Sequence, residues 1–553
     1  MHSFAPAPSG TVNRRTRSKE IPVFTSPYAP VEIPNLSIFD FLFGDLTEAE
    51  LERTAVIDGA TGEALSYRTL VDQITRVAGS LAAQGVGPGT VIGLLCPNTP
   101  EFTAVFHGIL RAGATVTTIN SLYTPDDIQR QLADSGATWL VTVSPLLPGA
   151  KAAAHAAGIP DEHIVVIDGE PGHPSLADLL AADAAAPVVT IVPATHVAVL
   201  PYSSGTTAAP KGVMLSHRNL VANVQQARDL IGVVPEDRVL ALLPFYHIYG
   251  MTVLLNLAFK QRAALVTMAK FDFVEFLRMI QDHRCSYVFI APPIAVAVAK
   301  HPLVESYDLS SVHTILSGAA PLDGTLAAAV AARLDCRILQ GYGMTEVSPV
   351  SHLIPIDAPH LSRASVGVTV PNMDCKLMST ETGEEIEVPA AGVSEPGELL
   401  VRGPNVMLGY LNNEQATRET IDTDGFLHTG DIATVSALGE VTIVDRSKEL
   451  IKYKGYQIAP AELEALLLTH PRIKDAAVIG VADADGQEIP KAFVVTVAES
   501  AVTAEEVMAF VSERVAPHKK VRAVEFIELI PKSASGKILR KDLRARERAA
   551  MLQ

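Results

Sequence analysis

Short apolar runs alternate with helix-like segments from about Phe41 onward, and this alternation constrains the fold more than any other feature. It is typical of α/β proteins, in which helices pack on a sheet of largely parallel strands. In the first part of the chain we expect strands at 91–95, 139–143 and 163–167. Between about 152 and 192 the chain is rich in Ala, Asp, Gly and Pro, which predicts a boundary between two similar lobes.

The second lobe repeats one local pattern, a strand that ends in a loop dense in polar residues, Gly and Pro. The strands are expected at 197–200, 239–243, 287–290, 312–316 and 337–339. In open α/β sheets, ligands bind beyond the carboxyl ends of the strands. We therefore expect the loops at 203–211, 244–250, 317–321 and 340–346 to meet in one cleft.

The loop at 202–212 is rich in hydroxyl groups, carries Lys211, and precedes a helix-like segment at about 217–230. Hydroxyls, backbone N–H groups and an ammonium can converge on a polyanion, so phosphate is the expected ligand. The loop is not a Walker P-loop, which has glycine before its lysine and a hydroxyl residue after it, whereas Lys211 lies between Pro210 and Gly212. A plain Ser/Thr/Gly turn is the alternative interpretation.

After about residue 363 the pattern changes to short alternating segments with turn residues, as at 397–403 and 439–444. Such segments predict the hairpins of a β-rich subdomain. The chain becomes strongly charged at 445–448, and the roughly 100 residues beyond have the size of a separate domain. We therefore divide the chain into a flexible N-terminal segment at 1–35, an N-terminal domain at 36–445 and a C-terminal domain at 446–553.

Composition excludes several classes of protein. A length of 553 residues exceeds what one hydrophobic core serves, and a net charge of −17 argues against nonspecific nucleic-acid binding. The four cysteines follow no metal-binding spacing, so we expect reduced core thiols in a cytoplasmic protein. No apolar run reaches the roughly 18 residues of a membrane span.

Ordered motifs carry a resemblance to one superfamily. They lie at 203–212, 244–250, 317–321, 340–346 (QGYGMTE), 428–431 (HTGD), 445–457 (DRSKELIKYKGYQ) and 531–537 (PKSASGK). The chain resembles the adenylate-forming enzymes, which include acyl-CoA synthetases, luciferases and peptide-synthetase adenylation domains. Residues 340–346 and 450–464 are most similar to 4-coumarate:CoA ligases, and the resemblance covers about 35 to 545.

The resemblance implies a fold and a reaction. The fold is α/β, with a large N-terminal domain of two stacked α/β lobes plus a β-rich subdomain, and a small mobile α+β C-terminal domain that turns about a hinge near Lys448. A carboxylate attacks the α-phosphorus of MgATP to give an acyl-adenylate and pyrophosphate, and the CoA thiol then displaces AMP. ATP, Mg²⁺, CoA and a small carboxylic acid are the implied cofactors and partners, and a homodimer is left open.

The resemblance also assigns nucleotide-binding roles. The triphosphate is expected against Ser203, Ser204, Gly205, Thr206, Thr207 and Lys211, and the adenine against Ala319, Ala320, Gly341, Tyr342 and Gly343. Thr345 is expected at the α-phosphate, Glu346 at Mg²⁺, and Asp431, with Arg446 beside it, at the ribose hydroxyls.

Catalytic roles follow in the same way. Lys537 would bridge the substrate carboxylate and the α-phosphate, and His247 would lie where the carboxylate passes. Outside the motifs, a solvated lysine and a satisfied loop histidine would be the ordinary interpretations. Lys452 and Gln457 are expected as further contacts during adenylation, and Lys454 and Gly455 as the floor of the pantetheine tunnel.

The acyl pocket is expected to be apolar. Its predicted lining is Ile248, Tyr249, Ile290, Leu316, Gly318, Gly343, Pro349, Val350 and Ser351, which fits a flat aromatic acid or a medium chain. Ser351 replaces a leucine of the plant enzymes, so their ring preferences do not transfer safely. Ala208 stands where relatives usually carry glycine, which predicts slower or weaker ATP use because alanine is penalised at positive φ.

The functional prediction is thus a 4-coumarate or cinnamate:CoA ligase. Ligation of medium-chain fatty or other aryl acids is the near alternative. An adenylating enzyme that loads a carrier protein is a further alternative, although Lys454 and Gly455 favour free CoA. A nonenzymatic nucleotide-binding regulator is disfavoured because it need not retain Glu346, Lys452 and Lys537 together.

Overall fold

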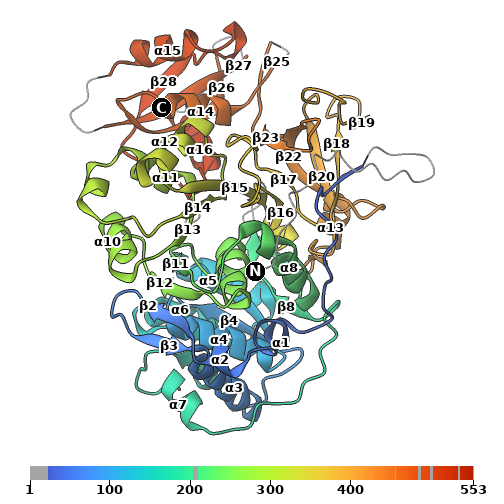
Figure 1. Cartoon of the computed structure of the whole chain (residues 1–553), viewed down its shortest axis with the longest axis vertical. Coiled ribbons are helices and arrows are strands. Elements are labelled where there is room, and N and C mark those ends of the chain that lie inside the picture. Colours follow the sequence, from blue (N-terminus) through green and yellow to red (C-terminus); the bar gives the residue numbers. More distant parts are fainter. Residues whose placement is uncertain are drawn as a thin grey trace.

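The computed structural model describes residues 23–203, 210–454, 456–483, 487–497, 502–533 and 536–551. Its first sheet, at the bottom of Figure 1, runs in the order β21-β10-β8-β5-β4-β6-β7, with β9 beside β10. The parallel strands are β4 (Val91–Leu95), β5 (Thr115–Thr118), β6 (Trp139–Thr142), β7 (Ile164–Val166) and β8 (Val197–Val199). The antiparallel strands are β9 (Tyr202–Ser203), β10 (Lys211–Ser216) and β21 (Gly409–Tyr410). The helices of this region are α3 (Tyr67–Ala83), α4 (Pro100–Arg111), α5 (Pro125–Ser135), α6 (Leu147–Ala156) and α7 (Leu176–Ala181).

The second sheet runs in the order β17-β16-β15-β14-β13-β11-β12-β2-β3. Its parallel part is β2 (Thr54–Asp58), β11 (Arg238–Ala241), β12 (Ala264–Thr267), β13 (Tyr287–Ile290), β14 (Thr314–Ser317) and β15 (Arg337–Gly343). Antiparallel strands β3 (Ala64–Ser66), β16 (Val350–Leu353) and β17 (Val368–Thr369) close its two edges. The helices of this region are α8 (His217–Ile231), α9 (Leu257–Lys260), α10 (Phe273–His283), α11 (Pro292–Lys300) and α12 (Gly324–Leu334), and a π-helix spans Tyr249–Asn256.

The predicted α/β class is confirmed, but the boundary predicted at about 152–192 is wrong. Strand β8, which follows that stretch, pairs with β5 of the first sheet, and the early strand β2 pairs with β12 of the second. The two lobes therefore interleave along the chain. The Ala-rich stretch contains β7 and α7, and α7 packs against α3. Its small residues make close helix packing possible, and local composition does not report which sheet a strand joins.

A third, antiparallel sheet forms the predicted β-rich part at the right of Figure 1. Its order is β1-β18-β20-β22-β23, with β19 beside β18. The strands are β1 (Phe24–Thr25), β18 (Asp374–Met378), β19 (Glu385–Ile386), β20 (Gly397–Arg402), β22 (Leu427–Val435) and β23 (Val441–Arg446), and α13 (Glu414–Thr420) precedes β22. Because β1 pairs with β18, residues 24–25 of the segment expected to be flexible are part of a sheet, while residues 1–22 lie outside the described chain.

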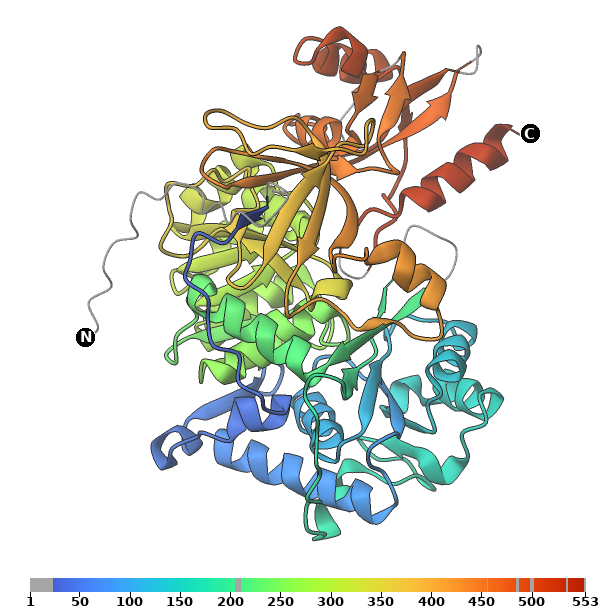
Figure 2. The ribbon, with the colours of Figure 1, turned by 90° about the vertical axis from the view of Figure 1, so that its right-hand side faces the viewer.

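The elements from β24 to α16 are called the C-terminal unit, and they lie at the top of both ribbon views (Figures 1 and 2). They comprise β24 (Ile451–Tyr453), β25 (Tyr456–Ile458), α14 (Pro460–Leu468), β26 (Ile473–Ala482), β27 (Glu488–Thr496), α15 (Ala504–Ser512), β28 (Ala523–Phe526) and α16 (Arg540–Met551). Strands β26 and β27 are antiparallel, and α15 leads to β28, which runs parallel to β27. Two apolar clusters inside this unit are separate from the main core.

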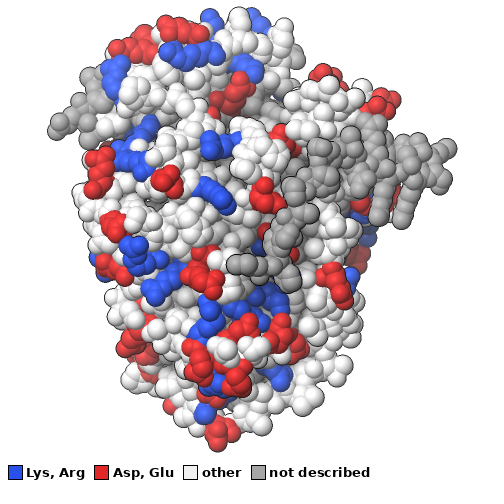
Figure 3. All heavy atoms as spheres, in the orientation of Figure 1, with Lys and Arg blue, Asp and Glu red and all other residues white. Residues whose placement is uncertain are grey.

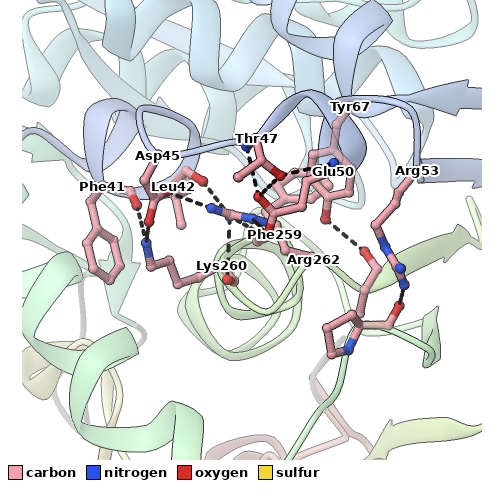
Figure 4. A network of polar contacts seen from close by, with 12 residues as sticks. Phe41, Leu42, Asp45, Thr47, Glu50, Arg53, Tyr67, Phe259, Lys260 and Arg262 are labelled. Carbon is pink, nitrogen blue, oxygen red and sulfur yellow. Dashed lines mark hydrogen bonds and ion pairs between the residues drawn. The ribbon is translucent and has the colours of Figure 1, made fainter.

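A buried arginine ties the early helices α1 (Ile38–Phe43) and α2 (Glu48–Leu51) to the end of α9 (Figure 4). The Arg262 guanidinium donates to the carbonyls of Leu42 at 2.8 Å and Phe259 at 3.0 Å, and to the Asp45 carboxylate at 2.6 Å. Its Nε lies 3.4 Å from the Glu50 carboxylate, and only 7% of the side chain is exposed. One cation thus satisfies two helix ends that would otherwise leave carbonyl groups unpaired.

The outer surface shows mixed charge. On the face drawn in Figure 3, Lys and Arg are interspersed with Asp and Glu, and the described residues form no broad basic patch there. None of the helices in the described part of the chain combines the length and apolar composition that a membrane crossing requires.

Candidate functional site

A cleft of about 2560 Å³ lies where both lobes, the β-rich sheet and the C-terminal unit meet. Four loops predicted to converge contribute to it: Ser203 and Lys211, His247 to Tyr249, Gly318 to Pro321, and Gly341 to Glu346 all line its wall. Strands β13, β14 and β15 lie side by side and parallel, so the loops that follow them emerge at one edge of the second sheet. Asp431, Arg446, Lys448 and Lys537 line the same cleft from the other side.

A carboxylate, a phenol and a guanidinium meet at the β-rich wall. The Tyr342 hydroxyl donates to the Asp431 carboxylate at 2.5 Å, and the Arg446 Nε lies 3.4 Å from the same group. Pairing of β22 with β23 sets Asp431 opposite Arg446, so the two side chains are neighbours by strand register. Asp431 is only 6% exposed, and the tyrosine and arginine hold its charge in place. This arrangement leaves an oriented acceptor at the edge of the cleft.

A second carboxylate, Glu346, lies in the turn after β15 and is 5% exposed. Its Oε1 accepts a hydrogen bond from the Tyr410 hydroxyl at 2.9 Å. The Lys211 Nζ lies 4.6 Å from the centre of the Tyr410 ring, a cation–π distance. Tyr410 therefore connects the acid to the lysine of the hydroxyl-rich loop. No sequence signal marked Tyr410, because β21 pairs with β10 across about 200 intervening residues.

The Glu346 site fits a magnesium ion bound together with a nucleotide. Magnesium is commonly held by one or two protein carboxylates plus substrate phosphates and waters. Tyr410 occupies one oxygen of Glu346, so the carboxylate is oriented, and Lys211 stands nearby for phosphate charge. Among the described residues no cluster of three or more His, Cys, Asp or Glu side chains forms a separate metal cage.

Lys537 enters the cleft from the C-terminal unit. Its backbone N–H donates to the Ser533 hydroxyl at 3.1 Å, and its carbonyl accepts from the Ser533 N–H at 2.8 Å, which closes a tight turn. The pKa of the Lys537 ammonium is lowered from 10.5 to about 8, mainly by burial and then by the charges of Arg446 and Arg540, against the opposing influence of Asp431 and Glu346. The turn thus presents a desolvated cation near both carboxylates.

His247 is a neutral hydrogen-bond donor. Its Nδ1 accepts from the Tyr249 backbone N–H at 3.3 Å, so the proton of the neutral ring belongs on Nε2. Burial, with a smaller contribution from the Lys537 charge, lowers the pKa of His247 from 6.5 to about 4. At neutral pH the ring therefore offers an N–H group without adding a charge to the cleft.

Tyr249 forms the wall of the expected acyl pocket. Its hydroxyl donates to the Leu316 carbonyl at 3.3 Å, and a Cβ placed on Gly318 would lie only 2.9 Å from its ring. The ring can occupy this position only because residue 318 is glycine. Ile248, Leu316, Gly343, Pro349 and Val350 line the cleft as predicted. Tyr246 and Val253, which sequence reasoning missed, also line it.

The prediction of the pocket lining was wrong for two residues, because Ile290 and Ser351 do not line the cleft. Ile290 is 1% exposed and contributes to the main hydrophobic core. The Ser351 hydroxyl is fully buried and lies 3.0 Å from His352 Nδ1. A buried hydroxyl needs a partner, and Ser351 finds it inside the sheet instead of facing the cleft.

Ala319 and Ala320, which were expected at the adenine, line the cleft beside Gly341, Tyr342 and Gly343, and Thr345 lies next to Glu346. Ala319 has a φ of +71°, a left-handed conformation that is unusual for alanine. Ser204, Gly205, Thr206, Thr207 and Ala208 of the hydroxyl-rich loop, and Gly455, lie outside the described residues. The described ends of that loop, Ser203 and Lys211, pair across β9 and β10.

The structure does not bring Lys452 and Gln457 into the cleft, contrary to the expectation that they act beside Lys537. They face each other across the exposed hairpin of β24 and β25. Lys454, also exposed, lies at the end of this hairpin with a φ of +49°. The C-terminal unit presents the Lys537 turn to the cleft, and in this arrangement it holds its hairpin elsewhere.

The chain is similar to known enzymes along nearly its whole length. Residues 46–411 match the AMP-binding enzyme family and residues 462–537 match the AMP-binding enzyme C-terminal domain. The chain is 42% identical over 535 residues to 4-coumarate--CoA ligase 5 of Oryza sativa subsp. japonica, covering 95% of this chain and 97% of the relative. It is 41% identical over 540 residues to 4-coumarate--CoA ligase 2 of Nicotiana tabacum, covering 96% and 98%.

Solved structures of CoA ligases and related enzymes share the fold of this chain. The anthranilate CoA ligase AuaEII in complex with anthranoyl-AMP superposes with a TM-score of 0.86 at 26% identity, covering 94% of this chain and 99% of that one. ATP-bound MatB from Rhodopseudomonas palustris superposes with a TM-score of 0.83 at 28% identity, covering 93% and 99%.

Proposed function

Because the chain belongs to the AMP-binding enzyme family and is an adenylate-forming acid:CoA ligase, we propose that it activates 4-coumarate or a close hydroxycinnamate. The observation that carries this proposal is the similarity to 4-coumarate:CoA ligases along nearly the whole chain. The pocket supports it: Ile248, Tyr249, Leu316 and Val350 are apolar or aromatic and uncharged. Such a wall suits a flat ring with one carboxylate at the open end.

In the first step, the acid carboxylate attacks the α-phosphorus of ATP and pyrophosphate leaves. We propose that Asp431 accepts from the ribose hydroxyls and that Lys211 draws the outer phosphates. Thr345, which lines the cleft next to Glu346, would contact the α-phosphate, and Glu346 would hold magnesium, which offsets triphosphate charge when bound. The main requirement is to bring two anions together, so charge and positioning contribute more than covalent chemistry by the protein.

Lys537 and His247 have complementary roles in this proposal. The Lys537 ammonium bridges the carboxylate and the α-phosphate, where negative charge gathers as the new bond forms. The His247 Nε2–H donates to the incoming carboxylate and fixes its direction. The Coulombic influence of Lys537 on the pKa of His247 supports their proximity in the cleft.

In the second step, the CoA thiol attacks the acyl carbonyl and AMP leaves. We propose that the C-terminal unit turns about Lys448 between the two steps. This turn would bring the hairpin residues to the cleft, namely Lys452, Lys454, Gly455 and Gln457. Lys452, Lys454 and Gln457 are exposed to solvent, so any contact with substrate requires such a movement. The division into domains at 36–445 and 446–553 belongs to the same proposal.

A substrate panel tests the proposal. Thioester formation is measured with ATP, Mg²⁺, CoA and each of 4-coumarate, cinnamate, benzoate and octanoate. We expect the highest kcat/KM for 4-coumarate. A preference for octanoate would move the assignment to medium-chain acids, and pyrophosphate release without any thioester would favour loading of a carrier protein.

We also propose a cytoplasmic location and leave a homodimer as a hypothesis. Cys96, Cys285, Cys336 and Cys375 are free thiols, which supports a reducing compartment. Fractionation of the source cells and light scattering of the purified protein test the two statements.

A further inference from the structure

Helix α14 of the C-terminal unit is held at both ends by residues outside the unit. We propose that Asp445 and Lys300 are positioning residues that grip the two ends of α14 and thereby set Lys537 in the cleft. This inference rests on the proposed function, because it assigns the grip to the adenylation step. The argument starts from the two helix ends, which need partners for their free N–H and C=O groups.

The N-terminal end of α14 lacks a cap of its own. The residue at the cap position is Ala459, whose methyl group cannot accept a hydrogen bond. The acceptor comes instead from Asp445, at the end of β23, whose Oδ2 accepts from the Ala461 N–H at 2.9 Å. Its Oδ1 accepts from the Arg446 N–H at 2.7 Å, so both carboxylate oxygens are used. Asp445 is 5% exposed, and an anion at this helix end is also favoured by the helix dipole.

The C-terminal end of α14 receives a cation. Lys300, the last residue of α11, donates from Nζ to the carbonyl of Leu468 at 2.6 Å and lies 3.4 Å from the carbonyl of Ile473. Leu468 is the last residue of α14, where a positive charge complements the helix dipole. The position of Lys300 is itself fixed, because Arg333 donates to the carbonyls of Val298 and Ala299 in the last turn of α11.

The position of α14 is transmitted to Lys537 through one buried ion pair. Glu464, in the middle of α14, accepts from the Arg540 guanidinium at 2.7 Å and also from the Val478 N–H of β26 at 2.8 Å. Arg540 follows Lys537 by three residues, and its Nε donates to the Val478 carbonyl at 3.2 Å. Asp445 and Lys300, α14, Arg540 and the Lys537 turn therefore form one connected set of contacts. Releasing the ends of α14 would free the turn to leave the cleft.

The variant Lys300→Met tests the grip, with Lys519→Met as the matched control. Lys519 also binds α14, through Glu462 at 2.7 and 2.9 Å, but both residues belong to the C-terminal unit. Single-turnover pyrophosphate release from ATP and 4-coumarate without CoA measures adenylation. Thioester formation from supplied coumaroyl-adenylate and CoA measures the second step.

For Lys300→Met we expect adenylation to slow about tenfold, the loss typical of one charge-assisted hydrogen bond, while the second step keeps its rate. Lys519→Met should leave both steps unchanged. Equal slowing of both steps by Lys300→Met would mean a general structural role and would overturn the proposal. An unchanged adenylation rate would overturn it as well.

A second measurement does not depend on which carboxylic acid the enzyme activates. Amide hydrogen exchange is followed in Asp445→Asn, whose single side-chain oxygen cannot serve both N–H groups that Asp445 serves. We expect exchange in the first turn of α14 to accelerate about tenfold, with β26 unchanged. Unchanged exchange in α14, or equal acceleration in β26, refutes the grip. If the wild type activates no acid of the panel, the substrate proposal fails, and this exchange result alone decides the role of Asp445.

Discussion

The low pKa of Lys537 predicts an alkaline limb in the first half-reaction. Burial lowers this pKa from 10.5 to about 8, so the free enzyme loses the ammonium charge as the pH rises through about 8. If only the charged form stabilises the attack on the α-phosphorus, the rate follows the charged fraction. At pH 9 roughly one tenth of the free enzyme keeps the charge, so kcat/KM for MgATP falls about tenfold from its neutral plateau.

The assay is pyrophosphate release with MgATP varied, from about pH 6 to about pH 10 at constant ionic strength, with 4-coumarate well below its KM for the kcat/KM profile and saturating for the kcat profile. The kcat/KM profile reports the free enzyme, whereas kcat reports the complex. Bound phosphates attract the ammonium and raise the pKa of Lys537, so the limb in kcat should lie at higher pH than the limb in kcat/KM. His247, with its pKa lowered to about 4, should add no limb near neutrality.

Lys537→Arg is the decisive variant, because a guanidinium stays charged throughout this range. Its plateau should be lower, since the fork of an arginine does not fill the position of a lysine ammonium. Its limb near pH 8 should vanish. If Lys537→Arg keeps the same limb as the wild type, another group titrates there and the assignment of Lys537 is refuted.

Three further substitutions test other parts of the structure. Tyr410→Phe removes the hydroxyl that donates to Glu346 and keeps the ring beside Lys211, so KM for MgATP should rise about fivefold with kcat nearly constant; a magnesium titration that matches the wild type would contradict this. Gly318→Ala would set a Cβ 2.9 Å from the Tyr249 ring and should lower kcat/KM for 4-coumarate about tenfold without changing KM for ATP, whereas in the control Gly87→Ala the new methyl meets only an atom at 3.9 Å. Arg262→Met should lower the free energy of unfolding by about 3 kcal/mol in urea titrations, because it strips the buried carbonyls of Leu42 and Phe259 of a side-chain donor and leaves Asp45 with Lys260 alone; a change below about 0.5 kcal/mol would show that the network in Figure 4 adds little stability.

Individual strands were predictable because a strand buried on both faces is a continuous apolar run. The expected strands at 91–95 and 287–290 coincide with β4 and β13. Sheet membership was not predictable, since β2 reaches β12 across about 200 residues and local periodicity carries no record of such a partner. The interleaving of the two lobes is therefore a property of long-range packing.

The site was predicted where a motif places its residues on one loop, and missed where pairing between distant segments creates it. Glu346 and Asp431 lie in motifs, and both line the cleft. Tyr410 became visible only through the pairing of β21 with β10. Ser351 shows the opposite error: the resemblance placed it in the pocket, where the plant enzymes carry a leucine, but its hydroxyl is paired inside the sheet.

The charges of the cleft explain why Lys537 belongs to a separate unit. Before ATP binds, the described cleft already contains Glu346 and Asp431 opposite Arg446, and the Arg446 charge lowers the pKa of Lys537. The ammonium is therefore poorly stabilised in the empty cleft, where burial removes its water and the cation beside it repels it. In the proposed first step, an α-phosphate that gains negative charge would relieve both penalties at once, so the attraction would be larger in the transition state than in the free enzyme. If the C-terminal unit turns as proposed, a lysine on the two lobes would carry this cost in both half-reactions, whereas Lys537 would carry it only during adenylation.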